Sequence, residues 1–113
     1  MAEPLRGEVW LVDLNPARGH EQAGKRPGLI VSVGLFNQGP AGLVVILPMT
    51  SKAKGIPLHV EVSIPDGGLR QQSFVKCEDI RSISKERLFK RVGRVSDETM
   101  KAVEDRLRIL LDL

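Results

Sequence analysis

The sequence predicts a mainly β protein with one C-terminal α-helix, arranged as a small and strongly curved barrel. Short runs rich in β-branched residues, bounded by glycine, proline or asparagine, follow one another as far as residue 95. From Ser96 onward, apolar residues instead recur every three or four positions, which is typical of an amphipathic helix. Successive short strands with tight turns favour a barrel, and the helix is expected to cover it.

Five or six of these runs are predicted to be strands. The run at 42–50, GLVVILPMT, is nearly all apolar, which indicates burial on both faces before Pro48 interrupts the ladder. The run at 57–65 alternates, so Val60 and Val62 should face the core while His59 and Glu61 face solvent. The other runs span residues 7–14, 28–34, 73–83 and 88–95, with a turn of helix expected at 84–87.

The last segment has a clear helical pattern. Ser96 is placed to cap the helix, and Asp97 and Glu98 in the first turn suit the helix dipole. The stripe that should pack on the barrel consists of Met100, Val103, Leu107, Leu110 and Leu111.

Length and composition predict a single soluble domain over residues 1–113. Apolar residues make up 42% of the chain and charged residues 27%, which suits a folded globular protein. Aromatic residues make up only 4%, so base stacking can be only a minor mode of recognition, and Trp10 is expected in the core or at a dimer contact. The only cysteine, Cys77, cannot form an internal disulfide and is expected to be an inert core thiol. With no long apolar run and no hydrophobic leader, we expect a cytoplasmic protein without a membrane segment.

The charge distribution favours an anionic partner. The formal net charge is +3 and the isoelectric point is near 9.4, which alone does not distinguish RNA, DNA, a membrane surface and an acidic protein. Basic residues gather at 18–26, 52–54 and 81–94. Neither histidine, His20 nor His59, has a cysteine or carboxylate at ligand spacing, so no metal site is expected. Phosphate-binding loops, dinucleotide fingerprints and nucleophile elbows are also missing, so no cofactor is expected.

Two polar residues at strand ends are the best candidates for chemistry. Arg26 precedes Pro27, which holds its backbone extended, and a guanidinium so placed can grip a phosphate with two hydrogen bonds. Thr50 ends a buried strand and is followed by Lys52 and Lys54. If strands 28–34 and 43–50 lie side by side, Arg26 and Thr50 could face the same phosphate.

Four segments in this order resemble one known family. They read RGEVWLVDLNPARGHEQAGKRPGLIVS, VVILPMTSKAKG, SFVKCEDIRSI and GRVSDETMKAVEDRL, and together they span nearly the whole chain. They are similar to the MazF/PemK/Kid-type toxin endoribonucleases of type II toxin–antitoxin systems. The resemblance implies an SH3-like (CcdB/PemK-like) barrel that forms a homodimer. It also implies metal-independent, cofactor-free cleavage of single-stranded RNA and neutralisation by a cognate MazE-like antitoxin.

The resemblance also implies roles for individual residues. The catalytic arginine and threonine of the family fall on Arg26 and Thr50, and an acid that matters in some members falls on Glu21. Some members use a basic residue and an acid on either side of a cysteine, and these fall on Lys76 and Glu78. Asp79 stands where the family pattern has glutamine, and Lys25 stands where several members have histidine. The expected RNA contacts are therefore Arg18, His20, Lys25, Ser51, Lys52, Lys54, Lys76 and Glu78.

Metal-free RNA cleavage of this kind uses the 2′-hydroxyl as nucleophile and leaves a 2′,3′-cyclic or 3′-phosphate and a 5′-hydroxyl. Arg26 and Thr50 can donate hydrogen bonds to the phosphorane. An arginine is almost never deprotonated in proteins, so we expect Arg26 to be an electrostatic clamp while Glu21 or His20 assists proton transfer. The consequence for a cell is cleavage of mRNA at short sequence motifs and inhibition of translation and growth.

Two alternatives belong to other functional classes. A CcdB-like gyrase-inhibiting toxin has a resembling fold but relies on a tryptophan near its C-terminus, whereas this chain ends LRILLDL and has its only tryptophan at position 10. A non-catalytic nucleic-acid-binding barrel would keep the basic loops but would not need both Arg26 and Thr50.

Overall fold

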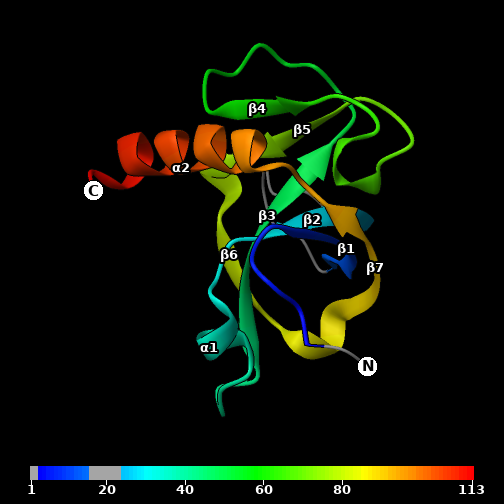
Figure 1. The fold of residues 1–113 in the computed structure, drawn as a ribbon, viewed down its shortest axis with the longest axis vertical. Coiled ribbons are helices and arrows are strands. Elements are labelled where there is room, and N and C mark those ends of the chain that lie inside the picture. Colours follow the sequence, from blue (N-terminus) through cyan, green and yellow to red (C-terminus); the bar gives the residue numbers. More distant parts are fainter. Residues whose placement is uncertain (1–2, 16–23) are drawn as a thin grey trace.

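The computed structural model describes residues 3–15 and 24–113 as an antiparallel β-structure with a C-terminal helix (Figure 1). The described strands are β1 (Glu8–Asp13), β2 (Lys25–Ile30), β3 (Leu43–Thr50), β4 (His59–Val62), β5 (Ser73–Lys76), β6 (Arg81–Ser84) and β7 (Leu88–Arg94). The helices are α1 (Gly34–Asn37) and α2 (Asp97–Leu111), with 3-10 turns η1 (Asp66–Gly68), η2 (Cys77–Asp79) and η3 (Lys85–Arg87).

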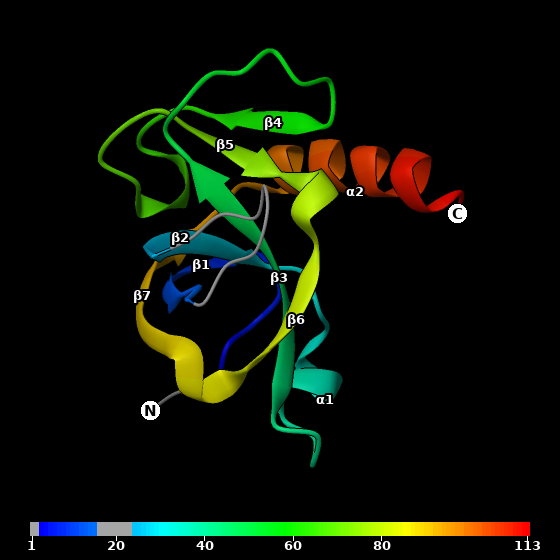
Figure 2. The same cartoon turned by 180° about the vertical axis from the view of Figure 1, so that it is seen from behind.

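Strand β3 lies at the centre of the sheet. The strand order is β4-β5-β3-β2-β1-β7, and β6 also pairs with β3. The start of β3 pairs with β6, and its last two residues pair with β5. Figures 1 and 2 show α2 beside β4 and β5 at one end of the molecule, with α1 at the opposite end. The predicted fold class, a mainly β barrel with a C-terminal helix, is confirmed.

The two sides of the sheet bury different sets of apolar residues, because successive side chains of a strand point to opposite faces. Val9, Leu29 and Leu47 are cross-strand neighbours on one face, and they belong to the cluster that α2 joins through Met100 and Val103. The other face carries a second cluster, made of Trp10, Val12, Leu14, Ile30, Val44, Ile46, Ile83 and Leu88. The prediction of Trp10 as a core residue agrees with this arrangement, since it is only 2% exposed.

The strands differ from the prediction in two places. The run at 73–83 is two strands separated by η2, because β5 pairs with the end of β3 and β6 with its beginning, and the chain must step between them. The described residues therefore contain seven strands, more than the five or six predicted. Strand β2 begins at Lys25 and ends at Ile30, so Arg26 lies within it, and α1 follows where a strand end was expected.

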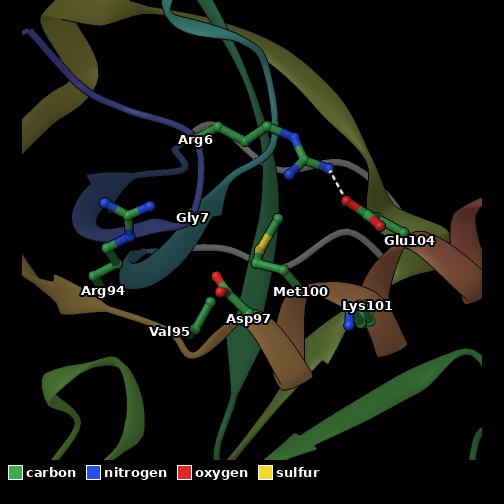
Figure 3. Close-up of a pocket in the computed structure, with 8 residues that line it drawn as sticks. All are labelled: Arg6, Gly7, Arg94, Val95, Asp97, Met100, Lys101 and Glu104. Carbon is green, nitrogen blue, oxygen red and sulfur yellow. Dashed lines mark hydrogen bonds and ion pairs between the residues drawn. The ribbon is translucent and has the colours of Figure 1, made fainter.

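Helix α2 is tied to the barrel through its first turns, where Met100 and Val103 are buried. The prediction that Leu110 and Leu111 also pack on the barrel is wrong, because both are exposed in the last turn. As predicted, Ser96 caps the helix, accepting a hydrogen bond from the backbone N–H of Thr99 at 3.2 Å. A pocket of about 270 Å³ lies between Gly7, the end of β7 and the first turns of α2. The guanidinium of Arg6 lies 2.7 Å from the carboxylate of Glu104 at this pocket, and Figure 3 shows the two side chains reaching toward each other. In the described part of the chain, no helix combines the length and apolar character needed to cross a bilayer.

Candidate active site

The register of β2 and β3 brings together the two residues expected to act on phosphate. Gly28 pairs with Pro48 in this antiparallel ladder. The paired residues of β2 and β3 end at Gly28 and Pro48, and Arg26 and Thr50 each lie two residues beyond this pair on their own strand. Because residues two apart on a strand share a face, a guanidinium and a hydroxyl are carried on one face at the same end of the two strands.

Thr50 is held in a defined orientation. The residue is 8% exposed, and its Oγ1 accepts a hydrogen bond from the backbone N–H of Lys52 at 3.2 Å. The backbone bond uses a lone pair of the oxygen, so the hydroxyl proton can still be donated to a bound anion. Arg26 is exposed on the neighbouring strand, where its guanidinium can reach such an anion.

The other basic residues of this region are mostly on the surface. Lys25 lies beside Arg26 with its Nζ 4.6 Å from the centroid of the Phe89 ring, a cation–π contact that restrains the ammonium. No pattern in the sequence around Phe89 indicates this contact, because it joins two different strands. Ser51, Lys52 and Lys54 are exposed in the segment between β3 and β4. Arg18, His20 and Glu21 lie outside the described residues.

Lys76 is a buried cation on the same side of the sheet as Thr50. It is only 5% exposed, and its Nζ lies 3.7 Å from Oδ2 of Asp79. The same oxygen accepts a hydrogen bond from the guanidinium of Arg81 at 2.7 Å. The sequence pattern does not indicate a role for Asp79 or Arg81, because the contacts of Asp79 with Lys76 and Arg81 depend on the turn η2 rather than on strand alternation.

Glu78 is bound to a histidine that was predicted to face solvent. Nε2 of His59 lies 2.7 Å from Oε2 of Glu78, and the imidazole is only 3% exposed, so the prediction of His59 as a solvent-facing residue is wrong. A carboxylate accepts, so Nε2 carries the proton of this hydrogen bond. The second ring nitrogen, Nδ1, is buried and has no hydrogen-bond partner within the described residues. The hydrogen bond to this carboxyl group offsets part of the cost of burying the imidazole.

Cys77 does not contribute a nucleophile in its buried position. Burial, and secondly the negative charge of Glu78, raise the pKa of its thiol to about 12, so the reactive thiolate is rare at neutral pH. This agrees with the predicted inert core thiol. Across residues 3–15 and 24–113, the histidine, cysteine and carboxylate side chains form no group of three or more suited to a metal ion.

Comparison with known proteins gives concordant results from sequence and structure. Residues 5–111 match the family described as "PemK-like, MazF-like toxin of type II toxin-antitoxin system". The chain is 39% identical to endoribonuclease MazF9 of Mycobacterium tuberculosis, over 96% of both chains. It is 34% identical to endoribonuclease EndoA of Bacillus subtilis, over 96% of this chain and 94% of EndoA.

Solved structures agree with these sequence relatives. The crystal structure of MazF from Deinococcus radiodurans superimposes with a TM-score of 0.89 at 29% identity, covering 100% of both chains. A mycobacterial endoribonuclease in complex with its cognate antitoxin superimposes with a TM-score of 0.79 at 29% identity, covering 100% of this chain and 97% of the other.

Proposed function

Because the chain belongs to the family of PemK-like and MazF-like toxins of type II toxin–antitoxin systems, we propose that it is an endoribonuclease that cleaves single-stranded RNA without a metal. The observation that carries the proposal is that Arg26 and Thr50 lie on one face at the same end of the paired strands β2 and β3. Relatives that are 39% and 34% identical are named endoribonucleases, which supports the reaction class.

In the proposed reaction, the 2′-oxygen of the RNA attacks the adjacent phosphorus, and the 5′-oxygen of the next nucleotide leaves. The guanidinium of Arg26 and the hydroxyl of Thr50 donate hydrogen bonds to the non-bridging oxygens, whose negative charge grows in the phosphorane. Glu21 or His20 takes the proton of the 2′-hydroxyl, and the acid so formed returns this proton, directly or through water, to the leaving 5′-oxygen. The products are a 2′,3′-cyclic phosphate, which can open to a 3′-phosphate, and a 5′-hydroxyl end.

The surrounding cations hold the RNA backbone on either side of the cut. Lys25, Lys52 and Lys54 are exposed and are suited to phosphate contacts. Contacts of this kind release counterions from the RNA, so binding should weaken steeply as salt rises. They position the strand without reading its sequence, which the neighbouring variable loops are expected to do.

The proposed partners are a second copy of the chain and a MazE-like antitoxin in the cytoplasm. The structure of a related endoribonuclease was solved with its cognate antitoxin, which supports such a partner. A surface with exposed basic residues that takes RNA is also suited to an acidic protein segment, so the antitoxin would compete with RNA for this face. Inhibition of translation and growth would then depend on the ratio of the two proteins.

The first test is to incubate the purified protein with a long single-stranded RNA in EDTA, beside the Arg26→Ala variant. A matched control is Arg108→Ala, which removes an exposed arginine from α2. We expect discrete cuts with 5′-hydroxyl ends for the wild type and the control, and none for Arg26→Ala. RNA binding without cutting by the wild type would favour the non-catalytic barrel, and neither binding nor cutting would favour a toxin with a protein target such as gyrase.

A further inference from the structure

Two cations converge on one carboxylate oxygen at the turn η2. Arg81 donates a hydrogen bond to Oδ2 of Asp79 at 2.7 Å, and Nζ of Lys76 lies 3.7 Å from the same oxygen. The three side chains are mostly buried, with exposed fractions of 6% for Lys76, 13% for Asp79 and 17% for Arg81. Their formal charges sum to one positive charge in a region where solvent screens poorly.

This cluster lies on the same face of the sheet as Thr50. Phe74 pairs with Thr50, and Lys76 is two residues further along β5. Thr50 and Lys76 are therefore diagonal neighbours on one face, and the usual spacing of such residues across an antiparallel pair is about 7–8 Å. Arg81 pairs with Ile46, which is four residues before Thr50 on β3 and therefore points to the same face. Oδ2 of Asp79 thus marks a point beside the candidate active site where the fold already holds an anionic oxygen.

The two cations are held unequally. The distance from Arg81 is that of a strong charge-assisted hydrogen bond, whereas the distance from Lys76 is too long for a hydrogen bond. The ammonium of Lys76 makes no hydrogen bond to another described residue, although it has three donors and is nearly buried. A buried ammonium with unused donors favours a strong acceptor such as a phosphate oxygen.

We propose that the carboxylate of Asp79 competes with the RNA backbone for the ammonium of Lys76. Asp79 is then a positioning residue, which keeps Lys76 on the substrate-binding face until a phosphate of the RNA takes the place of the carboxylate. On binding, Lys76 transfers its contact from Oδ2 of Asp79 to an oxygen of a phosphate next to the one that is cleaved. Arg81 stays with Asp79, so the carboxylate is not left unpaired. This inference rests on the proposed function, which gives RNA as the ligand.

The competition depends on the charge of residue 79. A neutral amide at this position would attract Lys76 much less strongly than a carboxylate does. Asp79 therefore lowers the affinity for RNA below the level that Lys76 and Arg81 alone would support. Replacing it with asparagine should tighten binding rather than weaken it.

The test measures RNA affinity with and without this carboxylate, in the Arg26→Ala background so that the probe is not cut. The probe is a fluorescently labelled single-stranded RNA of mixed sequence, titrated at several salt concentrations. We expect Asp79→Asn to tighten binding by about three- to tenfold, because one charge-assisted contact is released to the RNA. The slope of log affinity against log salt should steepen by about 0.7, the value for one further phosphate contact on a single strand.

Two further variants separate this effect from a general change in charge or a loss of structure. Glu98→Gln changes the net charge by the same amount at an exposed position in the first turn of α2, and it should alter affinity less than Asp79→Asn does. Lys76→Gln combined with Asp79→Asn should remove the gain, because Lys76 is the group that is released. Thermal unfolding curves of each variant check that the fold is retained.

The outcomes also distinguish this inference from the proposed function. Equal affinity for Asp79→Asn and its parent, an equal gain for Glu98→Gln, or a gain that survives Lys76→Gln would overturn the role of Asp79. In the active protein, Asp79→Asn should lower KM and leave kcat unchanged. If the wild type cuts no RNA in EDTA but Asp79→Asn still tightens binding through Lys76, the proposed ribonuclease fails and the competition stands.

Discussion

Nε2 of His59 and Oε2 of Glu78 lie 2.7 Å apart, joining β4 to the turn η2 across 19 residues of sequence. Removing the imidazole with His59→Ala would leave a partly buried carboxylate without this donor. We expect the free energy of unfolding to fall by about 2 kcal/mol in urea denaturation. Glu61→Ala changes an exposed residue on the same strand and should cost much less. Equal losses would show that the His59–Glu78 contact adds nothing.

Glu8 should make the stability of the fold depend on pH. Burial alone would raise the pKa of Glu8, but hydrogen bonds from the backbone N–H of Leu5, from Trp10 and from Arg91 outweigh it, so the pKa lies below its ordinary value of 4.5. A carboxyl whose pKa is lowered in the folded state stabilises the protein above its unfolded pKa, and that contribution is lost as pH falls through the folded pKa.

The measurement is the melting temperature of the wild type and of Glu8→Gln between about pH 7 and pH 3. The wild type should be more stable at neutral pH, and its advantage should shrink once the pH is below about 4. A difference between the two proteins that stays constant over the whole range would contradict the role of the ionised carboxylate.

The close approach of β7 to η1 requires glycine at position 93. A Cβ atom on Gly93 would lie 2.5 Å from the carbonyl oxygen of Gly67, a backbone atom that cannot move aside alone. We expect Gly93→Ala to lower the free energy of unfolding by about 3 kcal/mol, measured in urea. Gly55 has open space around it and a φ of +65°, so Gly55→Ala should cost only about 1 kcal/mol, for the left-handed backbone. Similar losses for both variants would contradict this packing argument.

Sequence reasoning succeeded where structure depends on neighbours in the chain. The helix that begins after Ser96 follows from a cap and from apolar residues at helical spacing, both of which are local, although only the first part of the predicted stripe is buried. Strand β3 follows from an apolar run that matches its observed bounds within one residue. The pairing of β2 with β3 follows from the usual pairing of consecutive strands. The joint action of Arg26 and Thr50 on one phosphate stays a prediction.

The features that sequence reasoning missed depend on residues that meet only in the folded chain. The break between β5 and β6 follows from which part of β3 each one pairs with, and no local breaker marks it. The alternating pattern of the strand is the same whether His59 faces solvent or a partly buried acid. Only the position of Glu78 in the fold determines that the imidazole is covered. The contact of Lys25 with Phe89 joins β2 to β7 in the same way. The predicted roles of Arg18, His20 and Glu21 stay predictions, because these residues lie outside the described part of the chain.

Cys77 should resist chemical modification in the folded protein. It is fully buried, and the burial that raises the pKa of its thiol to about 12 also keeps reagents away. We expect a disulfide reagent such as dithionitrobenzoate to react slowly at pH 8 and rapidly after unfolding in urea. A thiol that reacts completely within seconds in the native protein would contradict the buried position, and loss of RNA cleavage in Cys77→Ala, with the fold intact, would contradict an inert role.

Thr50 gives the sharpest test of the proposed chemistry, because its side chain can be replaced without changing its shape. Thr50→Val keeps the branched form that fills the strand end but removes the hydroxyl. If that hydroxyl donates to the phosphorane, the rate of the cleavage step should fall by about 10²–10³, as when one such donor is removed from other enzymes. Thr50→Ser keeps the hydroxyl and should retain most of the activity.

Single-turnover cleavage with excess protein separates this effect from binding, and the affinity of Thr50→Val for RNA should change little. Ser51→Ala removes a hydroxyl from the adjacent exposed residue and is the matched control. If Thr50→Val cleaves at the wild-type rate, or if Ser51→Ala loses as much, the hydroxyl of Thr50 does not stabilise the transition state. In that case Arg26 would have to supply the anion stabilisation together with cations such as Lys25, and Thr50 would only orient the turn through its bond to the N–H of Lys52.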